Sequence, residues 1–203
     1  MVVLLLLAMV LVFIAISYVR EQAARRQMTA ATRTSRAMAK TSPYYLHPSH
    51  SFARVISDAL VEVGMDDFSR HAFGYLDEIT LPEKGTTVHQ GDVAWKARVG
   101  GRLISQRIPV DGVVLESDAR SGGDWLLRIK PAHLADNLAN LMQGASIENW
   151  LKTVRAKFLL EHSGTLVPAM QDGGELVDGF ARHLTDAQWR EFCAEFFNYE
   201  THP

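Results

Sequence analysis

The sequence predicts a mainly β unit with helical additions, arranged as a compact sandwich or barrel. Three observations support this fold class. Across residues 44–130, short segments of alternating apolar and polar side chains are separated by turn signals every several residues. Beyond residue 144 the apolar residues recur at helical spacing instead. An unbroken apolar run at residues 2–19 precedes both regions and predicts a separate membrane helix.

The apolar run contains no charged side chain and is about as long as a helix that crosses a hydrocarbon core of roughly 30 Å. A cleaved signal peptide is the alternative. It is disfavoured because no basic side chain precedes the run, which ends in SYVR rather than in a small-residue cleavage site. The sequence therefore predicts a transmembrane helix over residues 1–20, which includes Val2, Leu5, Val10, Phe13, Ile16, Val19 and Arg20.

Residues 21–43 form a predicted basic juxtamembrane tether. From Arg20 to Lys40 the chain has six basic side chains and one acid, Glu21. The positive-inside rule then places the N-terminus outside and the rest of the chain in the cytoplasm, with a bacterial inner membrane as the favoured location. The same basic stretch is suited to anionic lipid head groups, although the topology signal alone accounts for it.

The stretch from Gly91 to Val114 predicts a β-hairpin. Gly100 and Gly101 mark its turn, because two-residue primed turns need positive φ angles. Pairing outward from this turn sets a register of Val99–Arg102, Ala97–Ile104 and Trp95–Gln106. One face is then mainly apolar, with Val93, Trp95, Ala97, Val99, Ile104 and Ile108. The other face carries Lys96, Arg98, Leu103, Ser105 and Arg107.

The remaining β segments are short. Strands are predicted over residues 51–56, 59–63, 75–81, 86–89, 113–116 and 125–130, with a polar loop at 118–124. A short helix is predicted over 66–73, capped by Asp66 or Asp67 and ended by Gly74.

Three stretches carry a resemblance to a known family: VEVGMDDFSRHAFGYLDEITLPEKGTTVHQGD, then IPVDGVV, then GDWLLRIKPAHLADNLANL. Through them, the chain from His50 to about Met142 resembles the glycine cleavage H-protein family. The resemblance implies a barrel-sandwich hybrid fold of the lipoyl-bearing kind over residues 44–143. It also implies a carrier whose lipoylated lysine lies at the hairpin tip. Residues 144–203 lie outside the resemblance and form a predicted helical C-terminal extension.

The resemblance fails at the position of the cofactor. In the family the lipoyl lysine lies eight residues before the proline of the P-V-x-G motif, and counting back from Pro109 ends at Gly101. The family's glutamate three residues before that lysine falls on Arg98. Lys96 is the nearest lysine but lies in mid-strand, and Lys84 lies in another turn. We therefore expect no lipoyl group and no other cofactor, with Lys96 as the fallback attachment site.

The C-terminal extension predicts two helices around a small hairpin. The first helix has apolar residues at helical spacing, namely Ile147, Trp150, Leu151, Val154 and Phe158. A turn at 172–174 separates short strands at 165–167 and 175–177. Thr185 and Gln188 form a capping box that opens the last helix. The aromatic stripe of that helix includes Trp189, Phe192 and Phe196, and it either packs on the β unit, as is more common, or docks a partner.

The composition argues against several classes of function. A formal net charge of -2 disfavours general nucleic-acid binding. The single cysteine, Cys193, excludes an intrachain disulfide and a multi-cysteine metal site. His47 and His50 have no further ligand close by in the sequence, and helix capping explains Asp66 and Asp67. Because no nucleophile elbow, phosphate loop or dinucleotide motif occurs, we expect neither an enzyme nor a metal site.

Two functions are compatible with these patterns. The first is a non-catalytic accessory or scaffold subunit of a membrane protein complex, anchored by its own helix, with the carrier fold reused for docking. Its docking residues would be Lys96, Arg98, Arg102, Arg107, Trp189, Phe192 and Phe196, unless the basic ones form only a solvated strand face. The second is a lipoyl carrier of the glycine cleavage type, modified at an atypical lysine such as Lys96, which fold analogy alone supports.

Overall fold

A computed structural model of the chain describes residues 43–119, 125–162 and 177–197. These residues belong to one compact unit, Pro43–Pro203. The predicted membrane helix at 1–20, nearly all of the predicted tether and most of the predicted hairpin at 165–177 lie outside the described residues. Within the described ranges, no helix has the length and apolar character required to span a bilayer.

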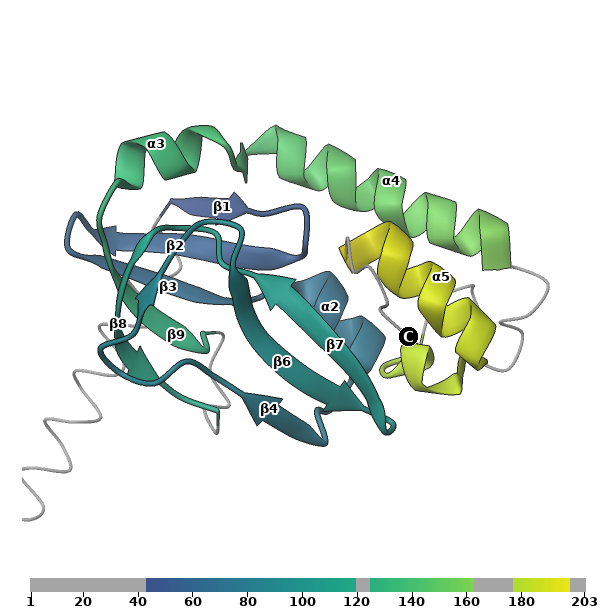
Figure 1. Ribbon diagram of the computed structural model, residues 1–203. Helices are drawn as coiled ribbons and strands as arrows, with labels where there is room; N and C mark the ends of the chain where they lie inside the picture. Colours follow the sequence, from purple (N-terminus) through teal and green to yellow (C-terminus); the bar gives the residue numbers. More distant parts are fainter. Residues whose placement is uncertain (1–42, 120–124, 163–176, 198–203) are drawn as a thin grey trace, which may run out of the picture. The chain divides into compact units, whose positions relative to one another are not determined.

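Ten strands and five helical segments make up the described unit, labelled as in Figure 1. The strands are β1 (Tyr44–Leu46), β2 (Ser51–Ser57), β3 (Leu60–Met65), β4 (Glu78–Thr80), β5 (Thr87–Val88), β6 (Val93–Val99), β7 (Arg102–Arg107), β8 (Gly112–Ser117), β9 (Leu127–Pro131) and β10 (Met142–Gln143). The helical segments are α2 (Asp67–Phe73), α3 (Leu134–Ala139), α4 (Ala145–His162), η2 (Phe180–His183) and α5 (Asp186–Phe197).

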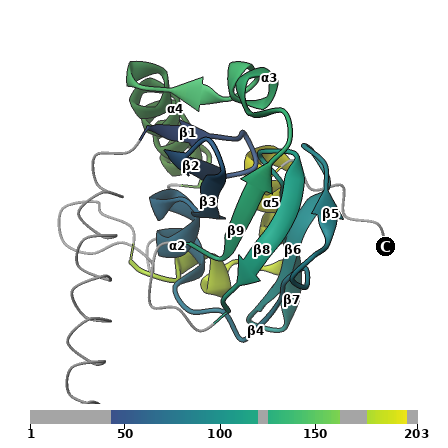
Figure 2. The same ribbon diagram turned by 90° about the vertical axis from the view of Figure 1, so that its left-hand side faces the viewer.

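The strands form two sheets. A seven-stranded sheet has the order β10-β1-β2-β3-β9-β8-β5, and a three-stranded sheet has the order β4-β6-β7. The small sheet lies in front of the large one in Figure 1, and Figure 2 shows the two from the side. Neither sheet closes on itself among the described strands. The mainly β class with helical additions is thus confirmed, in the form of two open sheets.

The predicted short helix and its caps are confirmed. The Asp66 carboxylate accepts a hydrogen bond from the backbone N–H of Ser69 at 2.8 Å, so Asp66 rather than Asp67 is the N-cap. Gly74 ends the helix with a φ of 67°, a positive value that glycine adopts without strain. The capping box of the last helix is also present, because the Thr185 N–H donates to Gln188 Oε1 at 2.8 Å.

Several short elements differ from the sequence prediction. The strand predicted over 75–81 is only β4, since Tyr75 and Asp77 turn toward η2 and the hairpin tip. The pattern analysis missed β1, β10 and α3, which have three, two and six residues. Segments this short carry too little periodicity to be recognised, and β1 forms only because it pairs with β2 on one side and β10 on the other.

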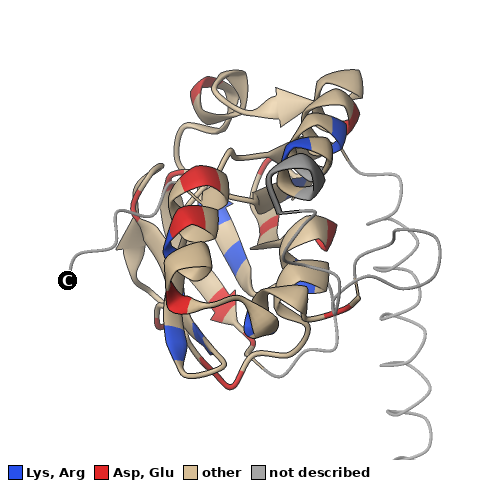
Figure 3. Ribbon diagram, turned by 90° about the vertical axis from the view of Figure 1, so that its right-hand side faces the viewer, with Lys and Arg blue, Asp and Glu red and all other residues tan. Residues whose placement is uncertain are grey.

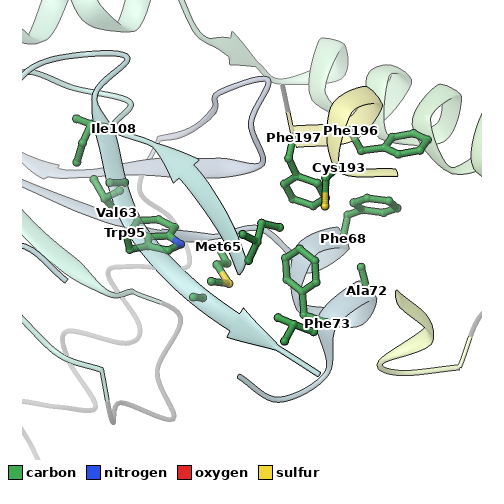
Figure 4. Packing of buried hydrophobic residues seen from close by; sticks show 14 of the residues in the cluster. Val63, Met65, Phe68, Ala72, Phe73, Trp95, Ile108, Cys193, Phe196 and Phe197 are labelled. Carbon is green, nitrogen blue, oxygen red and sulfur yellow. The ribbon is translucent and has the colours of Figure 1, made fainter. Parts of the chain in front are cut away.

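The C-terminal helices contribute to the main hydrophobic cluster of the sheets and α2, and Ile147 of α4 joins a smaller cluster with Leu46 and Phe52. Figure 4 shows side chains from α2 and from α5 meeting, with Phe68 and Phe73 close to Cys193, Phe196 and Phe197. The three aromatic residues predicted to dock a partner, Trp189, Phe192 and Phe196, are at most 5% exposed. That docking prediction is therefore wrong for these side chains, which bury their apolar area within the unit instead.

Backbone contacts fix the extension to the end of α2. The Gly179 N–H donates to His71 O at 2.7 Å, and Arg182 donates to Phe73 O at 3.1 Å and Tyr75 O at 2.6 Å. These donors satisfy carbonyls that a helix C-terminus leaves without intrahelical partners. A side chain at Gly74 would begin 3.1 Å from the Cα of Gly179, so glycine permits this close approach.

Gly112 lets β8 pass close to β9, and its replacement tests the packing of the large sheet. A Cβ at this position would lie 2.2 Å from Lys130 O and 2.7 Å from an Ile129 methyl carbon. We expect Gly112→Ala to lower the free energy of unfolding by about 3–5 kcal/mol, because the backbone of β9 has to move. Urea titration measures this loss. Gly85→Ala is the control, since Gly85 has a φ of +90° but no atom within 4 Å, and it should cost only about 1–2 kcal/mol. Equal losses would contradict the packing argument.

Cys193 is fully buried, and burial raises the pKa of its thiol from 9.0 to about 12. The raised pKa lowers the thiolate fraction at pH 8 by about a thousandfold, so the native chain should not react with Ellman's reagent until it is unfolded. A cysteine placed at the exposed position Thr80 is the positive control and should react at once. Fast labelling of Cys193 in the native chain would show that α5 does not pack as described.

Candidate functional site

The hairpin of β6 and β7 forms in the predicted register. Val99 pairs with Arg102, Ala97 with Ile104 and Trp95 with Gln106. The two tip residues, Gly100 and Gly101, have φ angles of 58° and 80°, as the primed turn requires. Both are exposed, and a Cβ built on either would meet nothing within 4 Å.

A β-bulge between Val93 and Trp95 changes the start of the hairpin. It inserts one residue, so the side chains before it reverse their faces. Ala94 is buried, whereas Val93, which was predicted on the apolar face, is 39% exposed. Ser105 differs from its prediction in the opposite direction: it was predicted on the solvent face, but its exposed fraction is only 6%.

Asp77 holds the hairpin tip from one side. Its carboxylate accepts hydrogen bonds from the Gly101 N–H at 3.3 Å and from the Arg182 guanidinium at 2.9 Å. These contacts, the one from Arg182 first, hold the pKa of Asp77 below its ordinary value. Arg182 also stacks over the Tyr75 ring at 3.5 Å. Gly101 at the hairpin tip is therefore tied to the C-terminal extension through Asp77 and Arg182.

Arg102 holds the tip from the other side. Its guanidinium donates to Leu184 O at 2.8 Å and to the Asp186 carboxylate at 3.1 Å, and it lies 5.4 Å from the centre of the Trp189 ring. Arg102 was predicted as a docking residue, but these contacts hold its guanidinium at the start of α5. A partner would have to compete with them.

The other predicted docking side chains remain at the surface. Lys96 and Arg98 are exposed, and Arg107 is partly buried. Arg98 lies 3.5 Å from Glu78 and donates to Gly101 O at 3.2 Å, while Arg107 donates to Gly91 O at 3.4 Å. The exposed apolar side chains Val93 and Leu103 lie opposite Arg107 and Arg98 in the register. We call these five residues the hairpin face.

Beneath the hairpin lies a buried polar network that the sequence analysis missed. The Gln106 side-chain nitrogen donates to Ser49 O at 3.1 Å, to His50 O at 2.9 Å and to Ser69 Oγ at 3.0 Å. The Gln106 side-chain oxygen accepts from Trp95 Nε1 at 2.9 Å. The register placed Gln106 among apolar neighbours, and a lone amide at such a position was the available signal.

His50 extends this network into the extension. It is fully buried with a φ of 62°, and its Nδ1 lies 2.6 Å from the Asp66 carboxylate. Its ring packs against Phe68, Trp150 and Phe197, with centroid distances of 4.7, 4.6 and 5.0 Å. The neighbouring histidine, His47, has its pKa lowered to about 4, chiefly by burial, and bonds Ser49. No group of three or more His, Cys, Asp or Glu suited to a metal ion occurs in the described part of the chain.

Comparison with known proteins identifies relatives of this unit. A "Probable glycine cleavage system H protein" of Pyrococcus horikoshii is 31% identical over 121 residues, which cover 54% of this chain and 90% of that protein. A "Glycine cleavage system H protein 2" of Pseudomonas syringae is 31% identical over 108 residues, covering 48% and 84%. A crystal structure of the H protein from Mycobacterium marinum aligns with a TM-score of 0.44 at 16% identity, covering 60% of this chain and 98% of that one.

No protein-family model matches the chain. The relatives nevertheless match over most of their own length, with the identity given above. On this evidence the chain belongs to the glycine cleavage system H protein family.

Proposed function

We propose that this chain is a non-catalytic, membrane-anchored accessory subunit of a membrane protein complex, which uses the H-protein fold for docking and carries no lipoyl group. One observation carries the proposal. The tip position that the family resemblance assigns to the lipoyl lysine is Gly101, which has no amine to acylate.

The surroundings of the tip support the same proposal. A swinging arm needs an exposed attachment point that is free to approach several partners. Here Asp77 bonds Gly101 at the tip, and Arg102, which directly follows the tip, bonds Leu184. Asp77 also accepts from Arg182, so both residues contact the C-terminal extension. A tip held on both sides is better suited to a fixed docking surface than to a moving carrier.

Membrane attachment rests on the sequence of residues 1–40. The uncharged run at 2–19 and the basic residues after it satisfy the length and charge criteria for a single-pass anchor with a cytoplasmic unit. Lys96, Arg98 and Arg107 lie at the surface of the unit and remain available for docking.

The absence of the lipoyl group is tested by the intact mass of the full chain, purified gently from its native membrane. We expect no lipoyl-sized increment on any lysine, because no lysine lies at the tip, and we expect membrane proteins to co-purify in fixed ratio. An H protein with a lysine at its tip, expressed in the same cells, is the positive control. A lipoyl increment on this chain would reject the proposal, whereas an unmodified chain without companions would reject the subunit role alone.

Membrane anchoring is tested by extraction with alkaline carbonate, which strips peripheral proteins. We expect the full chain to stay with the membrane pellet. The variant Val10→Asp with Phe13→Asp should move to the supernatant, since each acid near the centre of a spanning helix costs about 2.5–3.5 kcal/mol. The control exchanges two exposed acids outside the run, Asp58→Asn with Glu83→Gln, and should stay in the pellet. Extraction of the wild-type chain would reject the anchor.

A second function is favoured by the names of the relatives, both of which are glycine cleavage H proteins. In this case the chain is a lipoyl carrier that is modified at the exposed Lys96. We expect this alternative to fail, because Lys96 lies in mid-strand between Thr80 and Ser105 rather than in a turn. We expect Lys96→Arg to remove no acyl mass from the chain and to leave glycine-dependent growth unchanged. Lys84→Arg is the matched control.

A further inference from the structure

The hairpin face combines exposed apolar side chains with cations on one surface of the small sheet. Leu103 is 49% exposed and Val93 is 39% exposed. Leu103 lies opposite Arg98 and Val93 lies opposite Arg107, and opposite residues in a register point to the same side. The bulge after Val93 keeps it on the side of Lys96.

The charge of this face is moderately positive. Glu78 offsets part of the Arg98 charge at 3.5 Å, and the Asp92 carboxylate accepts from the His89 N–H at 3.0 Å beside the start of β6. Lys96 and Arg107 have no acid within salt-bridge distance among the described residues. In the view of Figure 3, acidic and basic residues are interspersed over the rest of the unit.

The edge of β7 is less suited than its face to receive a partner strand. At one end the Arg107 N–H donates to Ser49 Oγ at 3.1 Å, and Arg107 O accepts from Ser51 Oγ at 2.6 Å. At the other end Arg102 is bound to α5. With both ends of the edge engaged, the face remains as the surface on which a partner can lie.

We infer that the hairpin face lies against the anionic head groups of the membrane that holds the chain. This inference rests on the proposed anchor. Residues 21–43 reach at most roughly 80 Å when fully extended, so the proposed anchor would confine the unit to that distance from the bilayer. Two apolar side chains among three cations suit the boundary between acyl chains and anionic head groups, where each cation favours docking by about fivefold.

The test uses the full chain reconstituted in nanodiscs. A fluorophore on Thr80→Cys, which neighbours Lys96 on β4, reports energy transfer to acceptors in the head groups, and the buried Cys193 stays unlabelled. We expect higher transfer with phosphatidylserine than with phosphatidylcholine alone, and we expect concentrated salt to remove the difference. Lys96→Glu with Leu103→Ser should lower the docking equilibrium by about fivefold or more. The control is Lys84→Glu with Leu115→Ser, which changes an exposed lysine and an exposed leucine away from this face.

The outcomes separate the inference from the anchor. Failure of the full chain to enter nanodiscs would overturn both. The chain could enter nanodiscs while the energy transfer does not depend on the lipid, or the two double variants could lower the docking equilibrium equally. Either result would overturn the membrane-docking inference alone. Cross-linking of residue 80 to an acidic protein in native membranes, without lipid dependence in nanodiscs, would likewise overturn it and would assign the face to that protein.

Discussion

The side-chain amide of Gln106 is the interaction on which the arrangement of this unit depends. It joins β7 to the Trp95 indole of β6, to the turn before β2 and to the first turn of α2. Gln106 is fully buried, so each of these groups would lose its partner without access to water if the strand slipped. An orphaned buried polar group costs about 1–3 kcal/mol, and a slip would orphan several at once. The network thereby sets how the two sheets and α2 meet.

The hairpin could be predicted to the residue because its information is local. A Gly-Gly turn and strict alternation define the pairing from Trp95 to Gln106 without reference to the rest of the chain. Prediction failed at Val93, where a bulge breaks the alternation, and at Gln106, whose partners lie at residues 49, 50 and 69. The contacts of Arg102 with Leu184 and Asp186 could not be predicted either, because periodicity does not reveal which distant segments of the chain meet.

The C-terminal extension contacts the β unit at two places around the hairpin. It supplies two of the rings, Trp150 and Phe197, that enclose His50, and it contributes Arg182 and Asp186 to the contacts that hold the hairpin tip. The relatives match over most of their length while about half of this chain stays outside the alignment. The described residues of the extension are therefore part of the architecture around the tip, so the tip and the extension have to be considered together.

The pairing of β1 with β10 has a consequence for the order of assembly. Residue 45 pairs with residue 143, so β1 can cover its second edge only when β10, the last of the described strands, has been made. On the ribosome the N-terminal part of the unit is available long before this partner emerges. Contacts between residues so far apart in the sequence slow folding. Until β10 has been made, apolar surface of the unit stays exposed to chaperones or to aggregation. Under the anchor proposed above, the unit would complete its folding after the first segment has entered the membrane.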